Sequence, residues 1–460
     1  MRIILNNSIR LPQVSDELGQ LLKKNLTLPN PIWLDNERQG RWNKGVPRYL
    51  EFYRENDDSL EIPRGYMRPL INILGGLNIH FDMDDQRRML PETQFCFKGD
   101  LKSFQKKAVE QVLKKHFAVL TAPTGSGKTV MMLAIIAQRK QPTLIVVHTR
   151  DLATQWINRI GQFLGLPEKE VGFIGSGKFS LGKHITVAMI QSLYKRIPDI
   201  VPHVGHLVVD ECHRTPSRTF YEGVRVFDSY YMTGLSATPY RRDRLSSLIF
   251  WHLGDQAFEV NKKDLVNRGH ILQAEVILRP TSFTSQTDPT YHYGKLMAEL
   301  IEDQERNELI ASDVAHESKN KHGVCLVLSD RKNHCRAIEH LLKSRHGLDP
   351  VLLTGDLKAD ERHSIMERLD RQEISILIAT SQLLGEGFDS KQLSSLFLIY
   401  PIRFSGRLLQ YLGRILRPGN DKKARVFDYV DANIGVLEAA ANARQQVYHQ
   451  DGSGPEPCLA

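Results

Sequence analysis

One short stretch of the chain decides its fold: Leu120-Thr121-Ala122-Pro123-Thr124-Gly125-Ser126-Gly127-Lys128-Thr129. It follows an apolar run, residues 117–120, whose length and composition indicate a buried parallel strand. It leads into residues 130–136, which are apolar almost all round, as a helix buried against a sheet should be. A loop of small residues with one lysine and one threonine therefore joins a strand to a helix.

This loop has the chemistry of a phosphate site. Gly125 and Gly127 permit backbone angles that other residues resist, so successive N–H groups can turn around a phosphate. The helix N-terminus adds a partial positive charge, Lys128 adds a full one, and the Thr129 hydroxyl offers a ligand for Mg²⁺. The pattern is A-x-T-G-x-G-K-T, with alanine at 122 where the strict motif has glycine. It predicts a variant P-loop rather than a flexible glycine turn.

The composition is that of an ordinary globular protein. A length of 460 residues corresponds to two or three domains, and 41% hydrophobic with 25% charged residues is typical of such chains. The formal net charge is +8 and the pI is about 9.1. This charge favours an anionic partner, of which nucleic acid is the commonest.

Cysteine usage and hydropathy bear on the compartment. The five cysteines are scattered and include no C-x-x-C pair, which argues for a reducing compartment and against a disulfide framework or zinc site. No apolar run is long enough to span a membrane, and residues 1–9 lack the apolar core of a signal peptide. We therefore expect a cytoplasmic or nucleoid-associated protein with no membrane partner.

A regular alternation of strands and helices follows the P-loop. Strands are predicted over residues 143–147, 185–189, 206–209 and 231–235. Polar residues come at or just after the ends of these strands, namely Thr149, Arg150, Gln191, Ser192, Asp210, Glu211, His213, Ser236 and Thr238. This arrangement predicts a parallel sheet with a site along one edge.

The alternation is repeated further along the chain without a second P-loop. Strands are predicted over residues 323–328, 351–353, 374–379, 396–400 and 425–429. The polar residues of interest here are Thr380, Asp389, Gln410, Arg414 and Arg417. We expect a linker with a second lobe over residues 263–445, a first lobe over 98–262, and a flexible tail over 446–460.

Residues 1–97 precede the first lobe and carry no catalytic signature. Their short apolar stretches and turn residues predict a small α/β or mostly β domain. Within it, Arg38, Arg41, Lys44 and Arg48 are interleaved with Trp42, Tyr49, Phe52 and Tyr53. Basic residues among aromatic ones suit a nucleic-acid backbone with its bases, but a solvated strand face over a small aromatic core has the same pattern.

The motifs taken together indicate nucleotide hydrolysis. Singly, an Asp-Glu pair after a strand can cap a helix, and two arginines three apart usually form a solvated face. In this order, however, Asp210 can hold Mg²⁺ through water, and Glu211 can orient and deprotonate an attacking water. Arg414 and Arg417 lie one helical turn apart in the other lobe, so both can meet the charge that builds on the phosphoryl group.

Residues 100–440 resemble superfamily 2 helicases in the wording and order of their motifs. The matching segments are Gln105 with its neighbours, Ala122 to Thr129, Thr149-Arg150, Gln191-Ser192, Asp210-Glu211-Cys212-His213, Ser236-Ala237-Thr238, residues 380–389 and residues 410–418. The resemblance implies two tandem RecA-like parallel-sheet lobes, with ATP in the cleft and nucleic acid across both lobes. The D-E-C-H box differs from the D-E-A-D signature of RNA helicases. The ending Q-x-x-G-R-x-x-R-P looks more like the XPB, UvsW, RecG and restriction-translocase branches, which act on duplex or branched DNA.

The same resemblance implies a role for each motif residue. Gln105 reads the adenine, Thr124 to Thr129 hold the phosphates and Mg²⁺, Asp210 takes Mg²⁺, and Glu211 is the base. Asp389 lies near the ribose, while His213, Ser236, Thr238 and Gln410 couple the ATP site to the strand. The implied phosphate contacts of the tracked strand are Thr149, Arg150, Gln191, Ser192 and Thr380.

We therefore predict an Mg–ATP-dependent DNA helicase or translocase that unwinds or remodels duplex, forked or branched DNA, with other DNA-processing proteins as candidate partners. An RNA helicase is one alternative, and a translocase subunit of a nuclease or remodelling complex without strand separation is another. A third is a nucleotide-gated binding protein without turnover. The intact Lys128, Glu211 and arginine pair argue against this third alternative.

Overall fold

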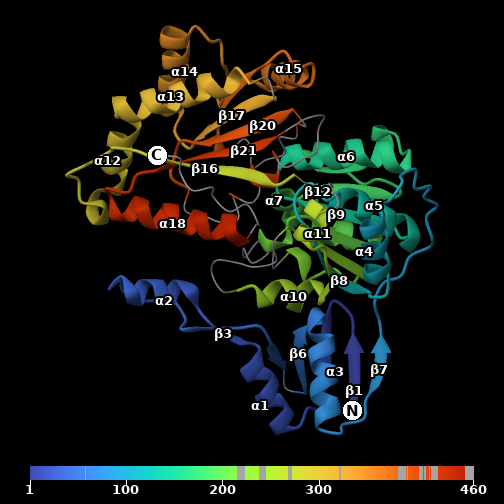
Figure 1. Ribbon diagram of the computed structural model, residues 1–460. Helices are drawn as coiled ribbons and strands as arrows, with labels where there is room; N and C mark the ends of the chain where they lie inside the picture. Colours follow the sequence, from blue (N-terminus) through green and yellow to red (C-terminus); the bar gives the residue numbers. More distant parts are fainter. Residues whose placement is uncertain are drawn as a thin grey trace. The chain divides into compact units, whose positions relative to one another are not determined.

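A computed structural model gives the fold. It describes residues 1–56, 58–214, 223–237, 245–267, 272–320, 323–381, 390, 392–402, 408, 411–413, 415 and 423–450. The chain divides into two compact units, one of Met1–Ala122 with Gly127–Val260, the other of Pro123–Ser126 with Asn261–Ala460. Figure 1 shows the ribbon of each unit.

The N-terminal part of the first unit is a small α/β domain. In the described residues its sheet has the order β5-β6-β2-β1-β7, with β1 and β7 parallel and the other neighbours antiparallel. Its elements are β1 (Arg2–Leu5), β2 (Ser8–Pro12), α1 (Asp16–Asn25), β5 (Arg54–Asn56), β6 (Ser59–Pro63), a 3-10 turn (Arg64–Tyr66), α3 (Met67–Gly76) and β7 (Asp82–Asp85). Alternate strand residues such as Ile3, Ile9 and Leu60 pack with Leu18 of α1 and Leu70 of α3 in one apolar cluster.

A long excursion interrupts this domain between α1 and β5. It consists of β3 (Thr27–Pro29), α2 (Pro31–Arg38), a loop and β4 (Tyr49–Glu51), with β3 and β4 antiparallel. The side chain of Asn30 accepts a hydrogen bond from the N–H of Ile32 and so caps α2. Helix α2 buries none of its residues and, in Figure 1, extends away from the sheet of its domain.

The first lobe follows in the same unit and is built on a larger sheet. Within the described part, its order is β11-β10-β12-β9-β13-β14-β8-β15, parallel throughout except for β10 and β11. The strands are β8 (Phe117–Thr121), β9 (Thr143–Val147), β10 (Gly172–Gly175), β11 (Lys178–Ser180), β12 (Ile185–Met189), β13 (His206–Val209), β14 (Tyr231–Ser236) and β15 (Gln256–Glu259). The helices are α4 (Ser103–Leu113), α5 (Lys128–Arg139), α6 (Arg150–Leu164), α7 (Ile190–Leu193), α8 (Ile197–Ile200) and α10 (Ser247–Leu253).

Parallel pairing aligns the carboxyl ends of the central strands. Ser236 of β14 pairs with Thr121 of β8, and Val209 of β13 pairs with Val146 of β9. Two bonds continue this register past the strand ends: the N–H of Ala122 donates to Ser236 O, and the N–H of Asp210 donates to Val146 O, each at 3.0 Å. The residues that follow these strands therefore emerge along one edge of the sheet.

The second unit contains a second parallel sheet. Its described strands have the order β16-β21-β20-β17-β19-β18. They are β16 (Ala274–Pro280), β17 (Val324–Ser329), β18 (Val351–Leu353), β19 (Ile376–Thr380), β20 (Leu393–Leu398) and β21 (Ala424–Val430). The helices are α11 (Lys262–Asn267), α12 (Pro289–Glu302), α13 (Gln304–Ser318), α14 (Lys332–His346), α15 (Ala359–Asp370) and α18 (Gly435–Gln450). In Figure 1, α13 and α14 lie on one face of this sheet and α18 on the other.

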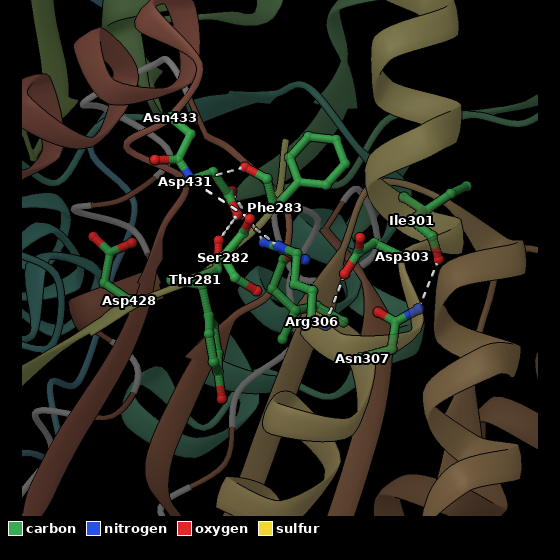
Figure 2. A network of polar contacts seen from close by, with 12 residues as sticks. Thr281, Ser282, Phe283, Ile301, Asp303, Arg306, Asn307, Asp428, Asp431 and Asn433 are labelled. Carbon is green, nitrogen blue, oxygen red and sulfur yellow. Dashed lines mark hydrogen bonds and ion pairs between the residues drawn. The ribbon is translucent and has the colours of Figure 1, made fainter. Parts of the chain in front are cut away.

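A buried polar network joins α13 to the sheet of the second unit (Figure 2). The guanidinium of Arg306 pairs with Asp431, with Nε at 2.8 Å from Oδ1, and donates to Ile399 O at 2.9 Å. The Thr281 hydroxyl donates to the same carboxylate at 2.6 Å. Since both charged side chains are about 1% exposed, removing either one would leave an uncompensated charge in the core.

The expected fold class is confirmed: two tandem parallel-sheet lobes follow a small α/β domain. The structure adds edge strands whose bounds the sequence did not predict, including β15 and β16, and β20 begins earlier than the predicted strand at 396–400. Strand β15 pairs with β8 through a register shift between Gln256 and Phe258, and such irregular edges carry a weak periodic signal. In the described part of the chain, no helix is long and apolar enough to cross a membrane.

The N-terminal domain is joined to the first lobe by a buried arginine. Arg64 is 2% exposed and has no acidic partner in hydrogen-bonding contact among the described residues; it donates to Ser229 O at 3.0 Å and lies 4.7 Å from the centroid of the Phe117 ring. Burial is the main reason that its pKa is lowered to about 9. Beside it, Gly65 is in close contact with the backbone of α10 and the residue that follows it: a Cβ there would lie 2.3 Å from Phe250 O and 2.7 Å from Gly254 N.

A second buried arginine ties the P-loop helix to the central strands of the first lobe. Arg139, at the end of α5, contacts the imidazole of His206 at 2.8 Å and donates to the Thr233 hydroxyl at 2.7 Å. It also donates to backbone carbonyls at and beyond the end of α4. Two buried guanidinium groups therefore connect the N-terminal domain, the P-loop helix and the central strands into a single unit.

We predict that Gly65→Ala destabilises the junction between the N-terminal domain and the first lobe. The atoms nearest to the new methyl group are backbone atoms, so the domain and the lobe would have to move apart. We expect this to lower the free energy of unfolding by about 1–3 kcal/mol. Thermal or urea unfolding measures the change. Gly75→Ala in α3 is the matched control, because a Cβ there meets nothing within 4 Å and alanine favours the helix. Equal stability of the two variants would contradict the tight junction.

We also predict that His334 makes the second unit acid-sensitive. This buried imidazole contacts Ser329 Oγ and Asn307 Oδ1, and burial, with a smaller contribution from Arg306, lowers its pKa to about 3. The pKa of His334 in the folded protein lies below the ordinary value of 6.5. Its contribution to the free energy of unfolding is therefore fully present above pH 6.5. Between pH 6.5 and about 3 that free energy falls by about 1.4 kcal/mol for each unit by which the pH is lowered. His334→Gln should flatten the pH dependence of unfolding between pH 6.5 and 4. The exposed His340→Gln on the same helix should not change that dependence.

Candidate nucleotide site

The P-loop is a closed turn between β8 and α5. The N–H and the hydroxyl of Ser126 both donate to Pro123 O, at 3.2 and 2.7 Å. Gly125 and Gly127 have φ of 85° and 84°, in the left-handed region that favours glycine. Lys128 Nζ donates to Ala122 O at 3.0 Å, across the mouth of the loop. Backbone N–H groups, an ammonium and a helix N-terminus are thus assembled within one short segment.

Gln105 of α4 is packed against this loop. Its Oε1 accepts from the N–H of Lys102 at 2.9 Å, and the residue is 7% exposed. A Cβ at position 127 would lie 2.5 Å from Gln105 Nε2, so glycine is required there for the amide to approach. The structure thus brings together the P-loop and the residue that the sequence analysis assigned to the adenine.

Asp210 follows β13 and is almost buried, at 8% exposure. Its Oδ2 accepts from Trp156 Nε1 at 2.8 Å, and its Oδ1 accepts from the N–H of Glu211 at 2.9 Å. Burial, and next the charge of Glu211, raise the pKa of Asp210 to about 6, while the Trp156 bond and the Lys128 ammonium act in the opposite direction. Asp210 follows β13 and the P-loop follows β8, and in the sheet these two strands are separated by β14 alone.

Glu211 has a backbone conformation that is rare for its residue type. Its φ is 49°, in the left-handed region, and such strain is retained where the surroundings hold it in place. Its Oε2 lies 3.2 Å from His213 Nδ1, which is also 3.2 Å from Ser236 Oγ. The structure therefore links Glu211 through His213 to Ser236 at the end of β14.

Most of the residues expected to contact the nucleic-acid strand lie in the segments that follow β9 and β12. Gln191 Nε2 donates to His148 O at 3.1 Å, which joins the segments after β12 and β9. Thr149 caps α6, since its hydroxyl accepts from the N–H of Leu152 at 3.4 Å. Arg150 and Gln191 are exposed and Ser192 is half-buried, whereas Thr380, at the end of β19 in the second unit, is 8% exposed.

Other predicted site residues are divided between the described and undescribed parts of the chain. Outside the described residues lie Thr238, Asp389, Gln410, Arg414 and Arg417. The four N-terminal basic residues are all exposed and lie between the end of α2 and the start of β4. They are Arg38, Arg41, Lys44 and Arg48.

The residues at this edge fit Mg²⁺ with a nucleotide. Magnesium prefers hard oxygen ligands and retains several waters, so one hydroxyl and one or two carboxylates are a suitable protein contribution. Thr129, in the first turn of α5, and Asp210 supply such oxygens. A cation there would also favour the ionised form of the buried Asp210.

Sequence reasoning missed Trp156 as part of this site. Its indole is 1% exposed, on the same face of α6 as the buried Ala153 and Ile160, so the periodic pattern reads as core. A buried indole N–H needs an acceptor, so a tryptophan on a core-facing helix position was the signal that the sequence offered. Only the fold identifies Asp210 as that acceptor.

Comparison with known proteins identifies the family. Residues 98–241 match the family model "Type III restriction enzyme, res subunit", and residues 304–419 match "Helicase conserved C-terminal domain". The chain is a superfamily 2 helicase, and its lobes are the RecA-like lobes of that superfamily. Members of this superfamily are helicase ATPases that bind nucleic acid and use Mg–ATP.

Individual relatives are distant. The chain is 28% identical to the "DNA 3'-5' translocase XPB2" of Sulfurisphaera tokodaii over 382 residues, 76% of this chain and 85% of the relative. It is 24% identical to the "Putative ATP-dependent RNA helicase L396" of Acanthamoeba polyphaga mimivirus, over 95% of this chain and 82% of that protein. A fragment of a putative HsdR subunit from Vibrio vulnificus has the same fold, with a TM-score of 0.59 at 17% identity, covering 78% of this chain and 68% of the fragment.

We predict that Trp156→Phe weakens metal-dependent nucleotide binding. Phenylalanine keeps most of the ring but cannot donate to Asp210, and a hydrogen bond to a charged group contributes about 1.5–3 kcal/mol. The Mg²⁺ concentration for half-maximal ATP hydrolysis should rise roughly tenfold or more. Ile160→Val on the same buried face of α6 is the control, because it reduces packing without removing this bond. A Mg²⁺ requirement unchanged in Trp156→Phe would show that the indole is structural.

Proposed function

We propose that the protein is an ATP-driven DNA helicase or translocase that moves on and unwinds or remodels duplex, forked or branched DNA. The observation that carries the proposal is the alignment of the P-loop, the Asp210-Glu211 pair and Ser236 at one edge of a parallel sheet. The name of the XPB2 relative and the wording of the D-E-C-H box support DNA as the substrate.

Each residue of the site has a distinct task in this proposal. Thr129 and Asp210 would hold Mg²⁺, which would neutralise charge on the ATP phosphates. Lys128 and the loop N–H groups bind the phosphates, and Gln105 contacts the adenine. Glu211 orients the attacking water and accepts its proton, and its contact with His213 holds the carboxylate in place.

The second lobe completes the reaction in this proposal. Arg414 and Arg417 meet the negative charge that develops on the transferred phosphoryl group, and Asp389 contacts the ribose. They belong to residues 263–445, which we propose as the linker and second lobe after a first lobe of 98–262, with a tail at 446–460. ATP binding would then favour lobe closure, and hydrolysis would release it.

Coupling to the nucleic acid would pass through the ends of adjacent strands. The contact of Glu211 with His213, and of His213 with Ser236, gives the ATP site a direct connection along the sheet edge. We propose that Thr238 and Gln410 extend this connection. The tracked strand would bind Thr149, Arg150, Gln191, Ser192 and Thr380. Such phosphate contacts position the protein without selecting a sequence.

Two other candidate functions each have a specific observation in their favour. The mimivirus relative is named an RNA helicase, and the match of the first lobe to a restriction-enzyme subunit favours a motor that translocates without separating strands. ATP hydrolysis by the protein should be measured with single-stranded DNA, duplex, forked DNA and RNA, alongside strand displacement. Stimulation by RNA alone would contradict the DNA proposal, and DNA-stimulated hydrolysis without displacement would favour a translocase.

We predict that Glu211→Gln separates binding from chemistry. The amide should still bind Mg–ATP but cannot accept the proton, so hydrolysis should fall by at least about 10²-fold while nucleotide affinity stays within a few-fold. Lys128→Ala is the contrasting variant, since it should lose nucleotide affinity itself. Arg417→Ala should lose about 10³–10⁵ in rate by removing an arginine finger. Loss of nucleotide binding in Glu211→Gln would contradict this division of tasks.

A further inference from the structure

Residues 30–51, which comprise α2, the loop after it and β4, are called the arm below. Amide side chains hold it together in place of an apolar core. Asn30 is 4% exposed, and its Nδ2 donates to Pro47 O at 2.8 Å while its N–H donates to Arg48 O at 2.9 Å. At the far end, Asn36 Nδ2 donates to Asn43 Oδ1 at 2.9 Å, and Asn43 Nδ2 donates to Trp33 O at 3.2 Å.

Two of the aromatic side chains of the arm are left largely in solvent. Trp42 is 85% exposed and Tyr49 is 51% exposed, and α2 buries none of its residues. Of the four aromatic residues in the sequence pattern, Phe52 and Tyr53 are partly buried, whereas Trp42 and Tyr49 belong to no aromatic core among the described residues. An indole exposed to this degree contributes little to folding, so an interaction with a ligand is its better explanation.

Two cations of the arm lie over its aromatic rings. Lys44 Nζ lies 5.7 Å from the centroid of the Trp42 ring, and Arg48 Cζ lies 5.0 Å from the Trp33 ring and 5.7 Å from the Tyr49 ring. Together with Arg38 and Arg41, these cations form no ion pair with any residue that the structure describes. The acidic residues of the arm are Asp35 and Glu37 in α2 and Glu51 in β4, and none lies within residues 38–48.

We infer that Trp42 stacks on an unpaired DNA base, with the arm cations on the flanking phosphates, so that the arm binds the junction between duplex and single strand. Lys44 occupies one face of the indole and leaves the other open, and only an unpaired or terminal base presents its own flat face. Aromatic stacking with cationic contacts to phosphate is how proteins bind single strands without reading sequence. The inference rests on the proposed function, since it names the DNA structure on which the motor acts.

The arm is anchored where the N-terminal domain meets the first lobe. Phe52, just after β4, contacts Trp251 of α10 edge to face, with centroids 5.6 Å apart, and its N–H donates to Leu26 O at 3.0 Å. The buried Arg64 and the close approach at Gly65 join the same two parts of the unit. A base held by Trp42 would therefore move with the first lobe during the ATP cycle.

The test uses forked DNA with 2-aminopurine, a fluorescent adenine analogue, at the first unpaired position of either arm of the fork. Binding of the wild-type protein should quench the fluorescence on one of the two forks, because stacking on an indole quenches this base. Trp42→Ala should abolish that quenching and weaken fork binding roughly 5- to 150-fold. Trp42→Phe, which retains a flat ring, should retain most of the affinity.

Ile32→Ala is the matched control, because Ile32 is 63% exposed on the same arm but is aliphatic, and it should leave both signals unchanged. Changing the four cations, Arg38, Arg41, Lys44 and Arg48, to alanine should also lower the slope of log affinity against log salt, by about 0.9 for each duplex phosphate that is no longer neutralised. Fork affinity and quenching unchanged in Trp42→Ala, or an equal loss in Ile32→Ala, would overturn the inference.

Failure of the proposed function would be seen separately, in the wild-type protein. If DNA did not stimulate its ATP hydrolysis, the motor assignment would be wrong whatever the arm binds. Normal DNA-stimulated hydrolysis together with an unaltered Trp42→Ala fork complex would contradict the arm alone.

Discussion

The site depends on the parallel register of four central strands in the first lobe. Because β9, β13, β14 and β8 run in the same direction, the segments that follow them emerge at one edge. The bond from the Ala122 N–H to Ser236 O fixes the start of the P-loop against the end of β14. A slip of one residue in any of the three pairings between the four strands would turn the side chains of the shifted strand to the opposite face and misalign the loop with the carboxylates.

This edge brings like charges together in a buried place. Asp210 and Glu211 are adjacent in sequence, and burial with their mutual repulsion raises the pKa of Asp210. The indole of Trp156 and the ammonium of Lys128 oppose that rise, and a bound cation would oppose it further. A divalent cation bound at this edge would therefore relieve the repulsion between the two carboxylates.

The sequence by itself determined the strand–loop–helix of residues 117–136, the order of the motifs and the parallel class of both sheets. These features depend on local chemistry, since glycines, a lysine and apolar runs of strand length have few structural alternatives. The predicted strands 143–147, 185–189 and 206–209 coincide with β9, β12 and β13 for the same reason. The small α/β domain before them was predicted only in outline.

Only the tertiary structure decided which of these features meet. The bond from Trp156 to Asp210, the contact of His213 with Ser236, and the close approach of Gln105 to Gly127 all join residues more than twenty positions apart in sequence. The same is true of the arm, where one pattern of basic and aromatic residues suited both a buried core and an exposed surface. Burial is a property of what packs against a residue, and a periodic sequence pattern does not contain that information.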